Sequence, residues 1–305
     1  YVNNRYIGYN LRLIQDMIDY ADELELEGAL IMLDFEKAFD TIEWNFMYAT
    51  LEKYGFDGSF IKWVKTIYAQ PETCVTNYGW FSDFFTVTRG IRQGCPLSAL
   101  LFIIVAEIMA INIRNNENIK GFVIGNNNDN VCIKLCQLAD DTTVFVRDQD
   151  SIVETLKTVK MFGDVAGLRL NTNKTEGMWI GALKNCNRKI GNILWPDKPI
   201  KTLGIYVGHD KILCNKLNWS DKLANIEKTL EKWSVRNLTM FGRVLILKTF
   251  IIAKLVYVAN VTPVPVGFME TINKLMFNFL WNGKREKIKR NTLIGSYDKG
   301  GIQMI

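Results

Sequence analysis

The sequence predicts an α+β segment followed by an all-helical one. Up to about residue 210, short β-rich runs alternate with helical patterns, whereas from Asp221 onward only helical spacing of apolar residues occurs. The charge changes near the same place: residues 219–305 hold 14 Lys and Arg against 6 Asp and Glu (+8), and residues 1–218 hold 23 against 26 (−3). With 305 residues, 48% of them hydrophobic and 23% charged, the chain can form one large core or two modest ones.

The first part of the chain reads as helix, strand, helix, helix. Leu, Ile and Met recur at helical spacing over residues 11–26, and the apolar run GALIML then predicts a strand that ends at Asp34. Helical patterns return over residues 36–54, where Gly55 is a reasonable stop, and over residues 59–68. A carboxylate is therefore expected between a buried strand and a helix.

A strand pair and a loop are expected next. Residues 73–87 alternate like two strands around Gly79. The stretch RGIRQGCPLS is a loop marked by glycine and proline, and it leads into a long apolar helix that starts at Leu97. This loop should therefore lie directly before a buried helix.

Two β-rich runs, Val131 to Leu138 and Thr142 to Val146, flank Ala139-Asp140-Asp141, so the acid pair is expected at the turn of a hairpin. The remaining expected elements are helices over 151–166, 221–234, 238–260 and 267–282, and strands near 177–181, 193–195 and 201–207.

Composition excludes several classes of protein. Six scattered cysteines lack the close pairing of a zinc knuckle and indicate a reduced intracellular protein. Because His209 is the only histidine, mechanisms that need a His base beside a Ser or Cys nucleophile are disfavoured. The longest apolar stretches, 97–110 and 244–261, contain charged residues and read as buried helices, so no membrane partner is expected. The sequence begins with Tyr1 rather than Met and is expected to be a piece of a longer protein.

Adjacent aspartates at a hairpin tip need compensation. At about 4 Å, two unit charges repel by roughly 4 kcal/mol at an effective dielectric near 20. Asp34 should end a strand of the same antiparallel sheet, so three carboxylates could gather at one end and bind Mg²⁺. Taken singly, each feature favours a simpler interpretation: Asp34 as a helix N-cap, and Asp140 with Asp141 as an ordinary turn pair.

Several motifs, in order, resemble those of a reverse transcriptase of the LINE-type (non-LTR) retrotransposon family. LDFEKAFDTI at 33–42 is similar to the first palm motif, RGIRQGCPLSALLF at 89–102 to the second, and LADDTTVF at 138–145 to the third. GLRLNTNKTEGMWIG at 167–181 resembles the fourth, IKTLGIYVG at 200–208 the primer-grip motif, and NLTMFGRVLILKTFIIAKLVY at 237–257 the thumb. The combination of RQGCPLS with DFEKAFD is highly specific.

The resemblance implies a right-hand polymerase with an α+β palm, built as an antiparallel sheet with packed helices, partial fingers and an all-helical thumb. The implied domains are residual fingers over 1–30, a catalytic palm over 31–215, and a helical thumb with a basic C-terminal segment over 216–305. Most basic residues of the fingers would lie upstream of this chain, so the isolated chain is expected to polymerise poorly or not at all. No RNase H or endonuclease signature occurs within these residues.

The implied reaction is RNA-templated addition of deoxynucleotides to a primer 3′ end by two-metal phosphoryl transfer. The implied partners are an RNA template, a DNA primer, their RNA–DNA hybrid and dNTPs, and the implied site of action is the nucleus. Two Mg²⁺ ions, or Mn²⁺, would be held by Asp34 and Asp140, with Asp141 as the third catalytic carboxylate and the carbonyl of Phe35 completing a shell. Lys174 would assist the pyrophosphate leaving group, with an exposed loop lysine as the alternative.

The resemblance also implies a nucleotide site. Phe39 stands where the family places the residue that abuts C2′ of the incoming sugar, although from the residues alone Phe39 beside Ala38 reads as a core aromatic. Ala38, Gln93 and Gly94 would lie near the incoming nucleotide, where glycine permits close backbone approach. The implied template and primer contacts are Arg89, Arg92, Pro96, Leu203, Gly204, Ile205, Lys284 and Arg285; for the charged ones, solvated side chains are the simpler interpretation.

Three alternatives stay open. The first is a related group II intron or retron reverse transcriptase. The second is an RNA-dependent RNA polymerase, which Phe39 disfavours because such an enzyme must accept a ribose 2′-hydroxyl. The third is a non-catalytic nucleic-acid-binding remnant of a retrotransposon. The sequence does not indicate the host, the template RNA or the oligomeric state.

Overall fold

The computed structural model describes residues 6–125 and 130–304 and divides the chain into two compact units, residues 1–200 and 201–305. The first unit contains the main sheet with its helices, and the second is almost entirely helical. The chain is thus a mixed helix-and-sheet protein, as expected from its sequence. The division of the units falls between Ile200 and Lys201, whereas the sequence places its expected palm–thumb boundary after residue 215.

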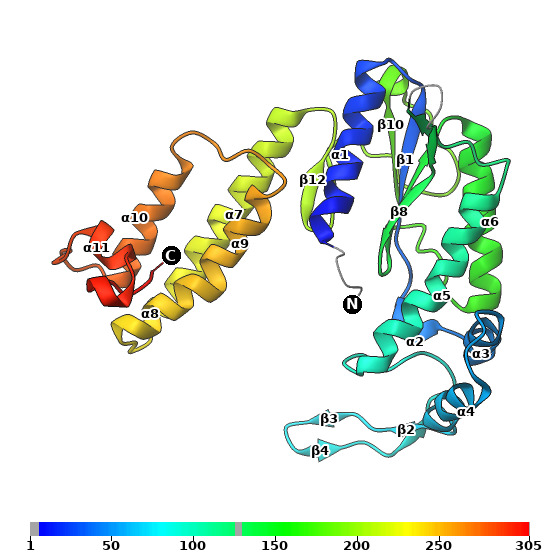
Figure 1. The fold of residues 1–305 in the computed structure, drawn as a ribbon, viewed down its shortest axis with the longest axis horizontal. Coiled ribbons are helices and arrows are strands. Elements are labelled where there is room, and N and C mark those ends of the chain that lie inside the picture. The colour runs from blue at the N-terminus through cyan, green and yellow to red at the C-terminus, as the bar shows by residue number, and fades with distance from the viewer. Residues whose placement is uncertain (1–5, 126–129, 305) are drawn as a thin grey trace. The chain divides into compact units, whose positions relative to one another are not determined.

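A four-stranded antiparallel sheet forms the centre of the first unit (Figure 1). Its strands are β1 (Gly28–Leu33), β8 (Leu135–Leu138), β9 (Asp141–Val146) and β10 (Glu176–Ile180), in the order β10-β1-β9-β8. Every residue of β1 is buried, which explains why GALIML is a continuous apolar run rather than an alternating one. The strand that precedes Asp34 is therefore anchored on both faces.

Helices cover both faces of this sheet. In Figure 1, α1 (Ile7–Glu23) lies on one side, and α5 (Pro96–Asn115) and α6 (Gln149–Ala166) lie on the other. Leu101, Phe102 and Val105 of α5 are buried in a cluster with Ile31 and Leu33 of β1. By length and composition α5 alone, among the described residues, could cross a membrane, yet half of that segment is buried within the protein. Its apolar sequence is accounted for by the core.

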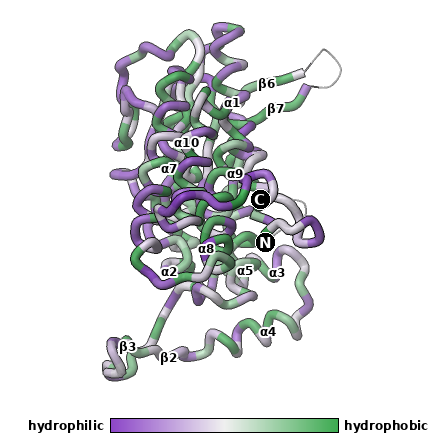
Figure 2. The backbone as a smooth tube through the Cα atoms, turned by 90° about the vertical axis from the view of Figure 1, so that its left-hand side faces the viewer, coloured by the Kyte–Doolittle hydropathy of each residue, from purple (hydrophilic) through white to green (hydrophobic). Residues whose placement is uncertain are grey.

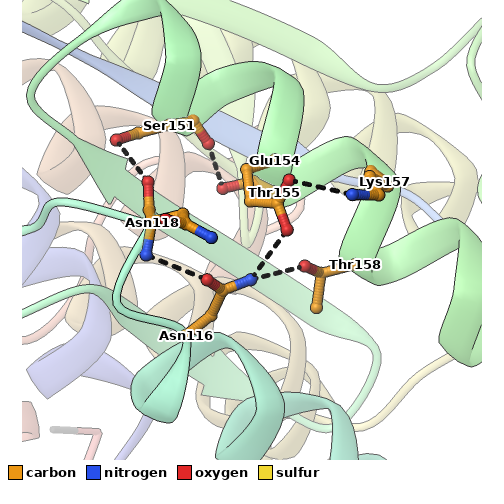
Figure 3. Close-up of polar contacts among 7 residues, drawn as sticks. All are labelled: Asn116, Asn118, Ser151, Glu154, Thr155, Lys157 and Thr158. Carbon is orange, nitrogen blue, oxygen red and sulfur yellow. Dashed lines mark hydrogen bonds and ion pairs between the residues drawn. The ribbon is translucent and has the colours of Figure 1, made fainter.

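A polar network ties the end of α5 to the start of α6 (Figure 3). The amide nitrogen of Asn116, the residue after α5, donates to Glu154 Oε1 and to Thr158 Oγ1, each at 3.1 Å. Ser151 Oγ donates to the carbonyl oxygen of Asn118, and the Asn118 backbone N–H donates to Asn116 Oδ1. These bonds satisfy polar groups of the loop that follows α5 and connect that loop to α6.

The single helix expected over residues 36–54 is wrong, because the structure has two helices, α2 (Ala38–Thr41) and α3 (Trp44–Lys53). At the break, the Ile42 carbonyl accepts from Gly90 N at 2.8 Å, and Glu43 N donates to the Ala166 carbonyl at 2.9 Å. These backbone groups bond to distant segments instead of to the next helical turn. The helix expected over 59–68 is confirmed as α4 (Gly58–Ile67), which Asp57 caps.

An arm of short strands follows α4: β2 (Glu72–Thr73), β3 (Thr76–Asn77), β4 (Trp80–Phe81) and β5 (Phe85–Thr86). Figures 1 and 2 both show it leading away from the sheet of the first unit. The expected strand pair around Gly79 is confirmed, since β3 pairs with β4 across a two-residue turn in which Tyr78 and Gly79 have positive φ. Its aromatic side chains are largely exposed.

The strand expected over residues 131–138 is interrupted at Lys134. Its first part, β7 (Val131–Ile133), pairs with β6 (Phe122–Ile124), which the sequence does not predict, and only its second part, β8, joins the main sheet. The helix expected over 151–166 is confirmed as α6, and the strand near 177–181 as β10. A short 3₁₀ helix, η1 (Gly181–Leu183), follows β10.

The second unit begins with a hairpin and continues as helices. The strand expected over 201–207 is instead a pair of strands, β11 (Ile200–Thr202) and β12 (Ile205–Val207), joined by a turn. Near 193–195, where another strand is expected, Leu194 forms an isolated bridge with Glu176. The helical elements are α7 (Lys211–Ser234), α8 (Met240–Ile246), the π-helix η2 (Leu247–Ile252), α9 (Ala253–Ala259), α10 (Phe268–Leu280), α11 (Arg290–Ile294) and the 3₁₀ helix η3 (Tyr297–Lys299). The helix expected over 238–260 is therefore nearly continuous but contains a π-helical segment.

The sequence misses the start of α7 by ten residues, since α7 begins at Lys211 rather than at 221. Asp210 caps this start by accepting a hydrogen bond from Leu213 N at 2.8 Å. Two turns later, the side chain of Asn218 bonds both the N–H and the carbonyl of Tyr206 in β12, at 2.7 and 3.0 Å. Because polar residues interrupt the apolar spacing over 211–220, the sequence does not predict this part of α7, which bonds to the β11–β12 hairpin.

Candidate active site

Three aspartates lie near one another at one end of the main sheet, as their pairing and their mutual electrostatic influence show. Strands β1 and β9 pair antiparallel with Leu33 opposite Thr142, so the next step of the same register sets Asp34 opposite Asp141. Strands β8 and β9 form a hairpin in which Leu138 pairs with Asp141, and the two residues between them are Ala139 and Asp140. Asp34 directly follows β1, an inner strand of the sheet, while Asp140 and Asp141 lie at the tip of the β8–β9 hairpin.

The hairpin tip contains an unusual backbone conformation. Ala139 has a φ of 53°, in the left-handed region that non-glycine residues avoid at a cost of about 1–2 kcal/mol. Asp140, the second turn residue, is exposed and has no positive φ. The tip thus holds an alanine where glycine or asparagine is usual, directly before the acid pair.

The carboxylates interact electrostatically. The pKa of Asp141 is raised, first by burial of its carboxyl group and then by the negative charges of Asp140 and Asp34. Asp141 nevertheless keeps an exposed surface as a whole residue, so the site opens to solvent. Negative charge is concentrated here, and a cation would relieve it.

Oxygen-preferring divalent ions fit this set of donors. Within residues 6–125 and 130–304, no three or more His, Cys, Asp and Glu side chains form a group that could hold a metal ion by themselves. Mg²⁺, however, is usually bound by one or two carboxylates and completes its octahedron with water and substrate phosphate. The oxygen donors of Asp34, Asp140 and Asp141 are therefore of a kind that divalent ions accept.

A buried threonine and a turn hold Asp34 in place. The backbone N–H of Asp34 donates to Thr175 Oγ1 at 3.2 Å, and its carbonyl accepts from Asn171 N at 2.8 Å. Thr175 has no exposed surface, and its own N–H donates to the Asn171 carbonyl at 2.8 Å. Sequence reasoning missed Thr175 and Asn171, although both lie in the run NTNKT that carries Lys174.

Lys174 lies in this turn, exposed to solvent, and its N–H donates to the Asn171 carbonyl at 3.1 Å. The same Asn171 donates to the Asp34 carbonyl, so one residue connects the Lys174 turn to the carboxylate end of the sheet. The structure therefore links the backbone of Lys174 to that of Asp34 through Asn171. No described side-chain partner restrains its ammonium group.

The residues after Asp34 differ in exposure. Phe35 and Ala38 are buried, and the Phe35 backbone pairs with that of Leu170. Phe39 is half-buried, and its ring stacks on that of Phe102 with centroids 4.6 Å apart. Its carbonyl accepts from Ile91 N at 2.7 Å. Phe39 is thus held in place by α5 and by the 89–94 loop, with part of its surface free.

The 89–94 loop docks against the break between α2 and α3. Trp44 Nε1 donates to the Gly90 carbonyl at 2.7 Å, and a Cβ on Gly90 would lie only 2.6 Å from the Asp40 carbonyl oxygen. Gly90 has a φ of 88°, so both its conformation and its surroundings require glycine. The loop is therefore positioned by backbone contacts rather than by its charged side chains.

The exposed part of this loop lines a groove of about 710 Å³, to which Arg89, Arg92 and Gln93 contribute together with Asp40, Trp44 and Tyr68. Arg89 also forms an exposed ion pair with Glu43 at 3.6 Å. Gly94, with open space around its Cα, and Pro96, at the first turn of α5, continue the loop toward the helix. Arg92, Gln93, Gly94 and Pro96 are all exposed.

The remaining expected contacts lie in the second unit. Leu203 and Gly204 form the two-residue turn between β11 and β12, both with positive φ, and Tyr257 donates to the Leu203 carbonyl. Ile205 is buried in β12. Lys284 and Arg285 are exposed in the segment after α10, where Arg290 is instead paired with Glu286 at 2.9 Å. These groups belong to the second unit, and the three aspartates belong to the first.

Residues 3–207 match the family model described as reverse transcriptase (RNA-dependent DNA polymerase), which covers more than half of the chain. The chain belongs to the reverse transcriptase family. Members of this family use divalent metal ions, in agreement with the oxygen donors at the end of the sheet. The match includes all three aspartates and the 89–94 loop.

Known proteins similar to this reverse transcriptase domain come from non-LTR retrotransposons. It is 28% identical over 288 residues to an uncharacterized 149 kDa protein of transposon TX1 from Xenopus laevis, covering 93% of this chain and 22% of that protein. It is 26% identical over 258 residues to the Pol polyprotein of the type-2 element R2DM from Drosophila melanogaster, covering 80% and 23%. The chain thus spans less than a quarter of the curated relatives it matches.

Solved structures similar to this domain include two telomerases, each in complex with a TWJ fragment of telomeric RNA. The telomerase of Candida tropicalis aligns with 94% of this chain and 46% of its own, at 12% identity and a TM-score of 0.48. That of Candida albicans aligns with 93% and 50%, at 12% identity and a TM-score of 0.43.

Proposed function

We propose that this chain is the catalytic core of an RNA-directed DNA polymerase that extends a primer 3′ end with deoxynucleotides, as one part of a larger retrotransposon polyprotein. The observation that carries the proposal is the β1–β9 register, which sets Asp34 opposite Asp141 beside the Asp140 turn in a chain of the reverse transcriptase family. Phosphoryl transfer requires no protein nucleophile, which agrees with a chain that has a single histidine.

Asp34 and Asp140 would hold two Mg²⁺ ions, with Asp141 as their neighbour. When bound, such ions activate the attacking oxygen and neutralise charge on the leaving one. The chain's own contribution is positional: Thr175 and Asn171 fix the backbone of Asp34, and the sheet sets the height of the hairpin opposite it. Lys174, on the turn bonded to Asp34, is suited to stabilise the negative pyrophosphate.

The layout that we assign is residual fingers over residues 1–30, a palm over 31–215 and a helical thumb over 216–305. The 89–94 loop and its groove would face template and nucleotide, with Arg89 and Arg92 near phosphates and Gln93 and Gly94 near bases. The Leu203-Gly204 turn and the exposed Lys284 and Arg285 would follow the primer and the hybrid mostly by shape and charge.

Phe39 is proposed as the group that excludes ribonucleotides. Its ring is fixed by the stack on Phe102 and keeps a free surface, so a 2′-hydroxyl would meet a rigid obstacle. Replacing Phe39 with Val should raise incorporation of UTP relative to dTTP by about 10-fold or more, because a smaller side chain leaves room for the hydroxyl. Unchanged discrimination would remove Phe39 from this role.

The direct test extends an oligo(dT) primer on poly(rA) with dTTP and Mg²⁺. The chain is compared with a longer form that restores its upstream residues from the parent protein, and Asp140→Asn is made in each. We expect extension by the longer form and a fall of about 100- to 1,000-fold on Asp140→Asn, because one charged group in a preorganised site typically contributes that much.

Binding to the hybrid serves as the control for folding, measured by fluorescence anisotropy on the same proteins. Asp140→Asn should leave the Kd for the oligo(dT)–poly(rA) hybrid within about threefold when Mg²⁺ is omitted. If neither wild-type form extends the primer while both bind the hybrid, the chain is a nucleic-acid-binding remnant rather than a polymerase.

A further inference from the structure

A second groove lies on the α6 side of the first unit, with a volume of about 590 Å³. Leu156, Lys157 and Lys160 of α6 form one wall, Arg169 and Leu170 of the following segment form another, and Ile193 closes the third side. Its volume is within the range of about 300–1,000 Å³ that small-molecule sites occupy. It shares no lining residue with the groove beside the 89–94 loop.

The floor of this α6 groove is apolar and well supported. Ile193 is buried in the main core, and Leu156 and Leu170 pack against the same core. Gly191 allows the 191–193 segment to lie against α6, since a Cβ there would be 2.5 Å from a methyl group of Leu156. The floor of the groove is therefore formed by residues that belong to the core of the first unit or pack against it.

The rim of the groove carries excess positive charge. Lys157, Lys160 and Arg169 line it against one acid, Asp164. Lys157 is drawn toward Glu154 at 3.4 Å, as Figure 3 shows, so Lys160 and Arg169 are the cations most available to a ligand. An apolar floor below two available cations suits a ligand that has an apolar body and one anionic group.

We propose that the α6 groove binds a small anionic amphiphile, such as an aromatic or aliphatic sulfonate, carboxylate or phosphate. The apolar body would contact Leu156, Leu170 and Ile193, and the anionic group would lie between Lys160 and Arg169. A nucleic-acid strand fits less well, because it would bring many phosphates to a site with few cations and an apolar floor.

Occupancy of the groove should affect the aspartates. Leu170 pairs with Phe35, Glu36 N donates to the Arg169 carbonyl at 2.9 Å, and Asn171 N donates to the Asp34 carbonyl. A ligand that contacts Arg169 and Leu170 therefore touches the segment bonded to the backbone around Asp34. Binding of the ligand does not depend on the proposed polymerase activity, but the expected effect on DNA synthesis does.

The test uses 8-anilinonaphthalene-1-sulfonate as the probe and methyl NMR of Ile, Leu and Val as the readout. We expect saturable shifts of the Leu156, Leu170 and Ile193 methyl groups with one common Kd. Lys160→Glu combined with Arg169→Glu should weaken binding at these methyls at least about 10-fold, because both attractive charges become repulsive. Lys53→Glu combined with Lys62→Glu, which changes the net charge equally at exposed lysines of α3 and α4 outside the groove, is the matched control and should leave the Kd unchanged.

The uncharged analogue N-phenyl-1-naphthylamine separates charge from apolar contact, and it should bind at least about 10-fold more weakly. The proposal is overturned if the three methyl groups do not shift, or if the double variant or the uncharged analogue binds as tightly as the probe with wild type. Shifts confined to the exposed aromatic arm also overturn it. If the methyls shift but primer extension by an active form does not change, the groove is a ligand site without coupling to Asp34.

Discussion

The two units carry net charges of opposite sign. Residues 1–200 hold 20 Lys and Arg against 25 Asp and Glu (−5), and residues 201–305 hold 17 against 7 (+10). The first unit places three of its carboxylates at one end of the main sheet, whereas the second has exposed cations over its helices and the segment after α10. Clustered acids in fixed positions are suited to chemistry, and dispersed cations are suited to following a phosphate backbone.

The strongest expected effect is on the position of Asp34. Thr175→Val keeps the shape of a fully buried side chain but removes the hydroxyl that accepts from Asp34 N. We expect primer extension to fall about 100-fold, because small misplacements of a catalytic group can cost that much. The rate is measured on the longer form with its upstream residues, at saturating hybrid and dTTP. Thr175→Ser, which keeps the hydroxyl, should retain most activity; equal loss in both variants would show that the hydroxyl is not what matters.

In the second unit, the matching buried polar group is Arg243, which is 5% exposed. Its Nη1 donates to the Phe279 carbonyl at 2.9 Å, and its guanidinium lies 5.0 Å from the Phe279 ring centroid. Arg243→Met should lower the free energy of unfolding by about 1–3 kcal/mol, because the buried carbonyl loses its donor. Urea denaturation measures this. The exposed Lys248→Met is the control, and an equal effect there would contradict the assignment.

The third prediction separates the units by salt dependence. Lys284→Glu with Arg285→Glu should weaken hybrid binding and reduce the slope of log Kd against log salt by about 2, because two phosphate contacts are lost. Anisotropy titrations between low and moderate salt measure the slope. Lys184→Glu with Lys189→Glu alters the net charge equally on exposed residues of the first unit and should leave the slope nearly unchanged. Equal slopes in both pairs would mean that only net charge counts.

The smallest expected effect compares two hairpin turns. Ala139 and Leu203 both have positive φ, at 53° and 48°, and each is the first residue of a two-residue turn. Replacing either with Gly relieves the strain but makes the unfolded chain more flexible, so we expect a gain in unfolding free energy of at most about 1 kcal/mol. Chemical denaturation measures both. A clear loss for Ala139→Gly alone would show that its methyl group packs usefully at the hairpin tip.

Patterns within short segments of the sequence predicted several strands and helices correctly. The strand before Asp34, the hairpin around Asp140 and Asp141, and helix α6 were all expected, because apolar periodicity and turn residues are encoded within each segment. The placement of Asp34 across from Asp141 follows from antiparallel pairing. The roles of these residues stay predictions that the experiments above address.

The predicted bounds of helices and strands were wrong where the backbone forms hydrogen bonds with segments that are distant in the sequence. The break at Ile42 and Glu43 exists because Gly90 and Ala166 supply hydrogen-bond partners from elsewhere in the chain. The early start of α7 depends on Asn218 bonding to Tyr206, and the split at Lys134 depends on β6, a strand with no strong signal of its own. No window of local sequence contains these partners.

The sequence by itself determined the family, the order of the motifs and the identity of the three carboxylates, because each is written in a short stretch of specific residues. Only the tertiary structure decided that Asp34 lies across from Asp141 with its backbone held by Thr175 and Asn171, and that Leu170 connects this backbone to the α6 groove. The physical reason is that these relations are hydrogen bonds and contacts between residues more than a hundred positions apart, which form only when the sheet is assembled.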